Sequence, residues 1–144
     1  MPAAHSLEPR RRMRLAKYVF TGAGIWGIVA LAPLYWLFDI TGRRYAPPAD
    51  YPHFFYGFLS VAMAWQFAFL VIGSNPARFR PLMIPAILEK LGYVSTLIVM
   101  YLRARIPAAD TQPVVPDLLL GLLFIFAFVR TRTPARNASG VGVR

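Results

Sequence analysis

The chain contains no cysteine among its 144 residues. This absence excludes disulfides, thiolate catalysis, thiolate-bound iron–sulfur clusters and zinc sites made with cysteine. Histidine is almost as scarce, because only His5 and His53 occur, and neither belongs to an HxH, ExxH or HExxH pattern. We therefore expect no metal site. In the main interpretation we assign no cofactor and no catalytic residue.

Acidic residues are also few. Six Asp and Glu stand against sixteen Lys and Arg, which gives a formal net charge of +10. Such a balance can indicate nucleic-acid binding, but here the basic residues flank apolar segments and do not form one long run. Basic residues are enriched in the cytoplasmic loops of membrane proteins. We interpret the charge as membrane topology and expect no nucleic-acid partner.

Apolar residues are abundant by contrast. The sequence is 57% hydrophobic, with 15% charged residues and a mean hydropathy of +0.48, whereas soluble domains have about 25% charged residues. A helix needs about 20 residues to span a bilayer, so the chain has room for four spans. The predicted spans cover residues 18–38, 53–73, 82–102 and 114–129. We predict an all-α integral membrane four-helix bundle.

The predicted organisation has three parts: a basic cytoplasmic leader (1–17), a four-helix transmembrane domain (18–130) and a flexible basic tail (131–144). The leader, the turn at 74–80 and the tail segment from Arg130 onward carry eleven Lys and Arg, against four in the two other connections. By the positive-inside rule, both termini face the cytoplasm. We expect a multi-pass protein of a bacterial inner (plasma) membrane.

A glycine motif lies inside the first predicted span. Residues 22–27 read GAGIWG and match the GxGxxG dinucleotide-binding fingerprint, but no βαβ unit surrounds them. Ala23 and Gly27 are four residues apart, a spacing that favours close packing of two membrane helices. We interpret the motif as a packing face. Further along this span, Pro33 predicts a kink.

Charged residues inside the third predicted span define the candidate site. Glu89 and Lys90 lie within it, and intramembrane ionisable residues are rarely left without a partner. Gln66 and Glu89 are equally far along the chain from the middle of the turn that joins the second and third spans. At about 1.5 Å per residue, antiparallel helices bring the two side chains opposite each other. We therefore predict that the Gln66 amide contacts Glu89.

The remaining members of this polar cluster follow from helical spacing. Tyr93 and Thr96 share a helix face with Glu89. Lys90 points about 100° away, a direction in which it could snorkel towards the cytoplasmic interface. Glu89 either pairs with Lys90 or is neutral. The cluster is either a proton relay or ligand site, or it is only structural. The basic turn at Arg78 and Arg80 is a candidate site for anionic lipid headgroups.

The stretch NPARFRPLMIPAILEKLGYV, which follows a span ending in WQFAFLVIG, resembles small bacterial proteins of the DoxX-like four-helix group. The matching positions are Asn75, Pro76, Arg78, Arg80, Glu89, Lys90 and Leu91. This resemblance implies a compact four-helix inner-membrane fold. It carries over no catalytic residues.

These observations favour a non-enzymatic membrane protein, either an accessory subunit of a larger membrane complex or a binder of lipid-like molecules. Its expected partners are membrane lipids, a larger complex or further copies of itself, and a quinone or lipid-like small molecule. The alternative is a small membrane enzyme or redox accessory that acts on a quinone or sterol-like substrate through Glu89, with Gln66 and Tyr93.

Overall fold

The computed structural model describes residues 7–37 and 52–131. Within these ranges the chain forms helices and turns but no strands, which confirms the all-α class. The α-helices are α1 (Leu7–Leu31), α3 (Pro52–Ser74), α4 (Met83–Leu102) and α5 (Val114–Arg130). The short 3-10 helices are η1 (Ala32–Tyr35), η2 (Arg80–Leu82) and η3 (Ala108–Thr111). The remaining residues of the predicted leader, of the first long loop and of the tail lie outside the described ranges.

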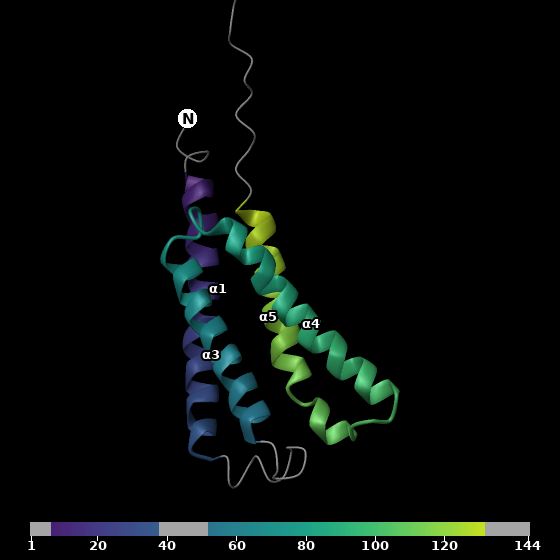
Figure 1. The fold of residues 1–144 in the computed structure, drawn as a ribbon. Coiled ribbons are helices and arrows are strands. Elements are labelled where there is room, and N and C mark those ends of the chain that lie inside the picture. The colour runs from purple at the N-terminus through teal and green to yellow at the C-terminus, as the bar shows by residue number, and fades with distance from the viewer. Residues whose placement is uncertain (1–6, 38–51, 132–144) are drawn as a thin grey trace, which may run out of the picture.

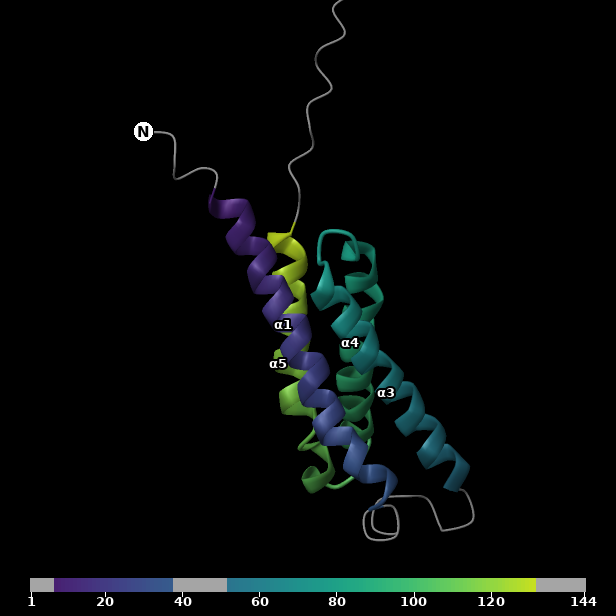
Figure 2. The ribbon, with the colours of Figure 1, turned by 90° about the vertical axis from the view of Figure 1, so that its left-hand side faces the viewer.

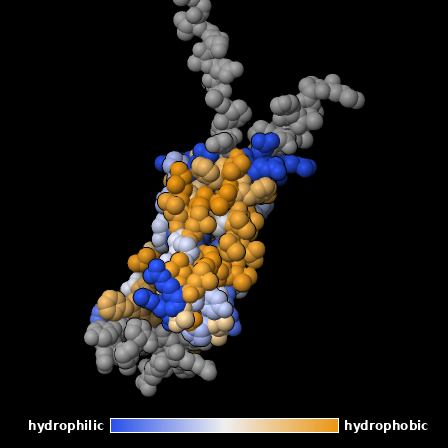
Figure 3. Space-filling model, turned by 90° about the vertical axis from the view of Figure 1, so that its right-hand side faces the viewer, coloured by the Kyte–Doolittle hydropathy of each residue, from blue (hydrophilic) through white to orange (hydrophobic). Residues whose placement is uncertain are grey.

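Helical segments of membrane-spanning length account for most of the described chain. These segments are Arg10–Tyr35, Pro52–Ser74, Arg80–Leu102 and Ala108–Arg130, with 26, 23, 23 and 23 residues. Each is long and apolar enough to cross a bilayer. Figure 3 shows one face of the molecule, where a broad hydrophobic band lies between hydrophilic residues at the two ends. The predicted spans therefore agree with the observed helices to within a few residues, except for the first.

The first helix differs from its prediction at both ends. It begins at Leu7 rather than at Tyr18, because the Arg, Lys, Leu, Met and Ala residues of this segment are strong helix formers. It ends at Leu31 and passes into η1, where Pro33 occupies one of the first two positions. Proline cannot donate a backbone hydrogen bond and clashes with the preceding helical turn. Pro33 thus ends the α-helix instead of kinking it.

The four helices run alternately up and down the bundle, and they associate as two pairs. Contacts are most extensive between α1 and α3 and next between α4 and α5, while α1 and α5 join the pairs. Helices α3 and α4 scarcely contact each other, although only a short turn connects them. In Figure 1 and Figure 2 the pairs converge near this turn and separate towards the opposite end.

Three phenylalanines form the core at the converging end. Phe20, Phe69 and Phe124 come from three different helices, and each is fully buried. The ring centroids of Phe20 and Phe124 are 4.2 Å apart, and those of Phe69 and Phe124 are 4.9 Å apart. Aromatic pairs at such distances contribute about 0.5–1.5 kcal/mol each beyond the area they bury. The cluster therefore holds both helix pairs together at this end.

The glycine motif lies where α1 packs against α3. Ala23 is buried in the core. A Cβ atom at Gly24 would lie 2.8 Å from the backbone carbonyl oxygen of Gln66, and one at Gly27 would collide with the Gln66 side chain. Small residues on α1 thus allow close approach of the two backbones, which confirms the interpretation of the motif as a packing face.

Candidate functional site

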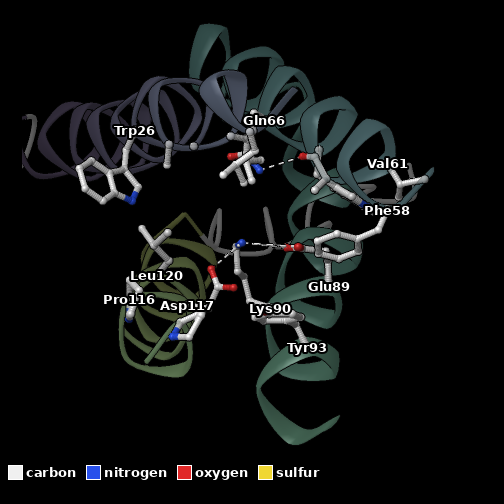
Figure 4. A pocket seen from close by; sticks show the side chains of 17 residues that line it. Trp26, Phe58, Val61, Gln66, Glu89, Lys90, Tyr93, Pro116, Asp117 and Leu120 are labelled. Carbon is white, nitrogen blue, oxygen red and sulfur yellow. Dashed lines mark hydrogen bonds and ion pairs between the residues drawn. The ribbon is translucent and has the colours of Figure 1, made fainter. Parts of the chain in front are cut away.

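A cavity of about 520 Å³ lies between the two helix pairs, and all four α-helices contribute to its lining. Its walls are largely apolar and aromatic, with Trp26 from α1 and Phe58 from α3 among the lining residues. Its polar lining consists mainly of Gln66, Glu89 and Lys90, together with residues described below. Figure 4 shows the side chains of α4 and α5 facing Gln66 across this space.

Lys90 is the centre of the polar lining. The residue is only 5% exposed, and its ammonium group lies 5.5 Å from the centroid of the Phe69 ring. Helix α5 approaches closely at Gly121, where a Cβ atom would lie 3.4 Å from the Cβ of Lys90. The ammonium nitrogen Nζ donates hydrogen bonds at 2.8 Å to Oδ1 of Asp117 and at 3.4 Å to Oε1 of Glu89. Lys90 therefore does not snorkel out of the cavity, because Asp117 on α5 holds its side chain there. It also lies within ion-pair distance of Glu89, which agrees with the paired alternative.

Asp117 is the site residue that the sequence analysis missed. It lies in the first turn of α5, so its chain position alone indicates a residue near the membrane surface. At about 1.5 Å per residue, Lys90 lies roughly 18 Å from the end of α4 and Asp117 only about 5 Å from the start of α5. The two meet because α5 begins further inside the bundle than α4 ends, with η3 in the connection between them (Figure 1). The available signal was the opposite charge of these two residues in successive spans.

Glu89 has a weaker set of interactions than Asp117. Its Oε2 atom lies 3.4 Å from Lys90 Nζ, within ion-pair distance, but accepts no hydrogen bond from any described residue although it is buried. A buried polar atom without a hydrogen bond costs about 1–3 kcal/mol. The Glu89 side chain is 21% exposed and lines the cavity, although its Oε2 atom is buried. Of the two carboxylates, Glu89 is thus the less satisfied.

Gln66 lies opposite Glu89, but the predicted contact between them does not form. The Gln66 amide nitrogen Nε2 donates a hydrogen bond at 2.9 Å to the carbonyl oxygen of Ala62, in its own helix. The residue is 4% exposed and packs against Gly27 of α1. Counting residues from the turn assumed that α3 and α4 stay parallel, whereas they separate. The cavity lies between these two side chains, and both line it.

The structure places the other two predicted members of the cluster, Tyr93 and Thr96, in different surroundings. Tyr93 lines the cavity, and its ring centroid is 6.3 Å from that of Phe58 across the opening. Thr96 is exposed and does not line the cavity. It lies roughly 10 Å further along α4 than Glu89, where this helix has moved away from α3 (Figure 1). Of the three residues predicted to share one face of α4, only Glu89 and Tyr93 therefore line the cavity.

Arg80, in the basic turn between α3 and α4, contacts Phe128 near the end of α5. Nη2 of Arg80 donates a hydrogen bond at 3.3 Å to the carbonyl oxygen of Phe128, and the guanidinium lies 4.1 Å above the ring of the same residue. Arg78 lies 5.4 Å from the ring centroid of Phe79. Arg80 thus fastens the α3–α4 turn to the end of α5. Lipid binding by Arg78 and Arg80 stays a prediction.

No protein-family model, no curated protein and no solved structure matches this chain. The resemblance to the DoxX-like group therefore stays a prediction. Within residues 7–37 and 52–131, no three His, Cys, Asp or Glu side chains come together in a group that could hold a metal ion. The site is best described as an apolar cavity with two carboxylates, one ammonium and one amide in its lining.

Proposed function

We propose that this protein is a multi-pass membrane protein of a bacterial plasma membrane that holds a lipid-like or quinone-sized amphiphile between its two helix pairs. Both termini face the cytoplasm in this proposal. The cavity with its buried ionic group is the observation that supports it. Ligand pockets have volumes of about 300–1,000 Å³ and mostly apolar walls with a few polar groups. The cavity described above, at about 520 Å³, falls within this range.

The ionic group supports a ligand site over a purely structural cluster. A structural ion pair is best satisfied when every carboxylate oxygen has a donor, because a buried charge is costly to desolvate. Here Glu89 retains a buried oxygen without a hydrogen bond, and this residue borders a space large enough for a ligand. An amphiphile with a polar group near Glu89 and Gln66 and an apolar body against Trp26 and Phe58 would fill this space.

Filling the cavity with a side chain tests the proposal. Ala62 lines the cavity, whereas Ala64 on the same helix is exposed on the outer surface. We expect the wild-type protein, purified in mild detergent, to retain an amphiphile that mass spectrometry identifies. Ala62→Phe should lower the retained ligand at least about tenfold, corresponding to about 1.4 kcal/mol, and Ala64→Phe should not change it.

Equal retention in both variants, with both folded by circular dichroism and size-exclusion chromatography, would contradict the proposal. The same purification separates the cavity ligand from bulk lipid, because bulk lipid is retained equally by all three proteins.

A second candidate function is that of a small membrane enzyme or redox accessory in which Glu89 transfers a proton to or from a bound quinone or sterol-like substrate. The observation that favours it is the same weakly satisfied carboxylate, which adjoins Tyr93 in the cavity lining. The two candidates separate in one comparison. If the protein is an enzyme, the wild type converts its bound substrate and the Glu89→Gln variant does not. If it is a binder, the ligand recovered from both proteins is chemically unchanged.

A further inference from the structure

We infer that the cavity selects a ligand with a single positive charge, an amine or quaternary ammonium carried on an aromatic or aliphatic body. This inference rests on the proposed function, since it names the class of ligand for the same cavity. It depends on three observations: the charges in the lining, the way the lysine divides its hydrogen bonds, and the aromatic walls.

The described lining of the cavity is short of one positive charge. Two carboxylates, Glu89 and Asp117, face it, and Lys90 is the one cation among its lining residues. All three lie in segments of membrane-spanning length, where a net charge is costly unless it is paired. A monocationic ligand would bring the formal charge of the occupied cavity to zero. A neutral ligand would leave it at −1, and an anionic ligand would raise the repulsion.

Of the two carboxylates, Glu89 has the weaker hydrogen bonding. Lys90 makes its short hydrogen bond, 2.8 Å, to Asp117 and only a 3.4 Å bond to Glu89. Charge-assisted N–H···O bonds are strongest at about 2.7–2.9 Å, so Asp117 takes most of the stabilisation that the ammonium offers. Glu89 keeps its second oxygen free of hydrogen bonds. Rotation about its last side-chain bond, which is soft in Glu, can turn either oxygen towards a cation in the cavity.

The walls have the chemistry that organic cations prefer. Four aromatic residues line the cavity: Trp26 from α1, Phe58 and Trp65 from α3, and Tyr93 from α4. Aromatic faces attract ammonium and quaternary ammonium groups through their electron-rich π systems, and desolvation strengthens this attraction. Such walls also accommodate an apolar ligand body. The carboxylate therefore accounts for the charge preference, and the rings account for an organic rather than an inorganic cation.

Three fluorescent probes with one body and different charges test the inference. They are trimethylammonium-diphenylhexatriene (+1), diphenylhexatriene (neutral) and diphenylhexatriene propionic acid (−1). Each accepts energy from tryptophan, and two of the three tryptophans, Trp26 and Trp65, line the cavity. The full-length protein in zwitterionic lipid nanodiscs is titrated with each probe, and the saturable part of the energy transfer reports cavity binding above lipid partitioning.

The cationic probe should bind at least about tenfold more tightly than the neutral one, and the anionic probe should show the weakest binding. Saturable binding with no preference for the cation overturns this inference and leaves the proposed function standing. No saturable binding of any probe, together with equal ligand retention in the Ala62→Phe and Ala64→Phe comparison, overturns both.

Matched variants identify the group responsible. Glu89→Gln removes the charge and keeps the shape, and we expect it to reduce the preference for the cation to less than about twofold while binding of the neutral probe is kept. Asp117→Asn should also weaken cation binding, because it releases Lys90 to pair with Glu89. Asp110→Asn, in η3 outside the cavity lining, is the control and should bind all three probes like the wild type.

A full cation preference in folded Glu89→Gln would overturn the inference. This result would mean that the preference arises from Asp117 or from the aromatic walls and not from the Glu89 carboxylate.

Discussion

Lys90 determines how two acidic side chains can share one cavity inside the bundle. Its ammonium lies between them, 2.8 Å from Asp117 Oδ1 and 3.4 Å from both Glu89 oxygens. Taking one partner out of a buried ion pair costs about 3–5 kcal/mol, whereas replacing both partners with apolar residues is often neutral. The lysine is therefore the residue whose loss is hardest to compensate.

We expect Lys90→Met to lower the free energy of unfolding by about 2–3 kcal/mol, less than for a fully buried pair because both carboxylate side chains are about one fifth exposed. Adding Asp117→Leu should restore at least half of this loss. Reversible unfolding in mixed detergent micelles measures both values. An additive, larger loss in the double variant would show that the two side chains do not stabilise each other.

The sequence identified Glu89 and Lys90 as site residues, but it did not identify Asp117. Glu89 and Lys90 stand out in any reading of the sequence, because they are charges within an apolar run. Asp117 does not, since an acidic residue in the first turn of a helix is favourable by itself. Its role depends on how deep α5 begins, which is a property of the connection between α4 and α5 and not of the residue.

Helices α1 and α3 form the rigid half of the molecule because glycine lets their backbones meet. A Cβ atom at Gly24 would lie 2.8 Å from both the Gln66 carbonyl oxygen and the Leu70 side chain. Backbone cannot move aside as a flexible side chain can. By contrast, a Cβ at Gly22 would meet nothing within 4 Å. The two positions are two residues apart on one helix and provide a matched comparison.

Gly24→Ala should destabilise the protein by about 1–3 kcal/mol through overpacking. Gly22→Ala should be neutral or stabilising by up to about 1 kcal/mol, because alanine favours helix more than glycine does. Thermal unfolding of the two variants followed by circular dichroism gives the comparison. Equal transitions would mean that α1 and α3 do not pack closely at this point in the membrane.

At this scale the sequence predicted the elements well and their relations less well. Long apolar runs identify spans because a bilayer requires them, and three of the four helices have their expected ends to within a few residues. The predicted contact between Gln66 and Glu89 depended on α3 and α4 lying side by side after a tight turn. They separate instead, because α3 packs on α1 and α4 packs on α5. Which helices pair is decided by surface shape, including the glycines of α1.

Among residues 7–37 and 52–131, the helices converge at one end, here called the closed end, and the two pairs separate towards the other. The first turn of α1, the last turn of α5 and the α3–α4 turn lie together at the closed end (Figure 1), where the phenylalanine core is located. Much of the outer surface is apolar, with exposed residues such as Val29, Leu88 and Leu122. This distribution fits a lipid environment, because a lipid-facing surface must be apolar while a small polar interior is protected.

The absence of cysteine makes the proposed topology directly testable. Single cysteines at Ser139, in the tail, and at Ala108, in the connection between α4 and α5, should lie on opposite sides of the membrane. A membrane-impermeant maleimide added to intact spheroplasts should label Ala108→Cys at least about tenfold more than Ser139→Cys, in keeping with the positive-inside rule. Permeabilised cells should label both. The reverse pattern would place the termini outside.

In the proposed function, a small molecule occupies the space between the two helix pairs. Photoaffinity labelling with a long-chain alcohol that carries a diazirine, mapped by mass spectrometry in nanodiscs, tests it most directly. We expect saturable labelling at Trp65 and Leu120, which line the cavity and are partly buried, and we expect Ala62→Phe to remove this labelling and Ala64→Phe to keep it. Labelling confined to outward-facing residues such as Leu88 and Leu122, proportional to probe concentration and equal in both variants, would contradict it.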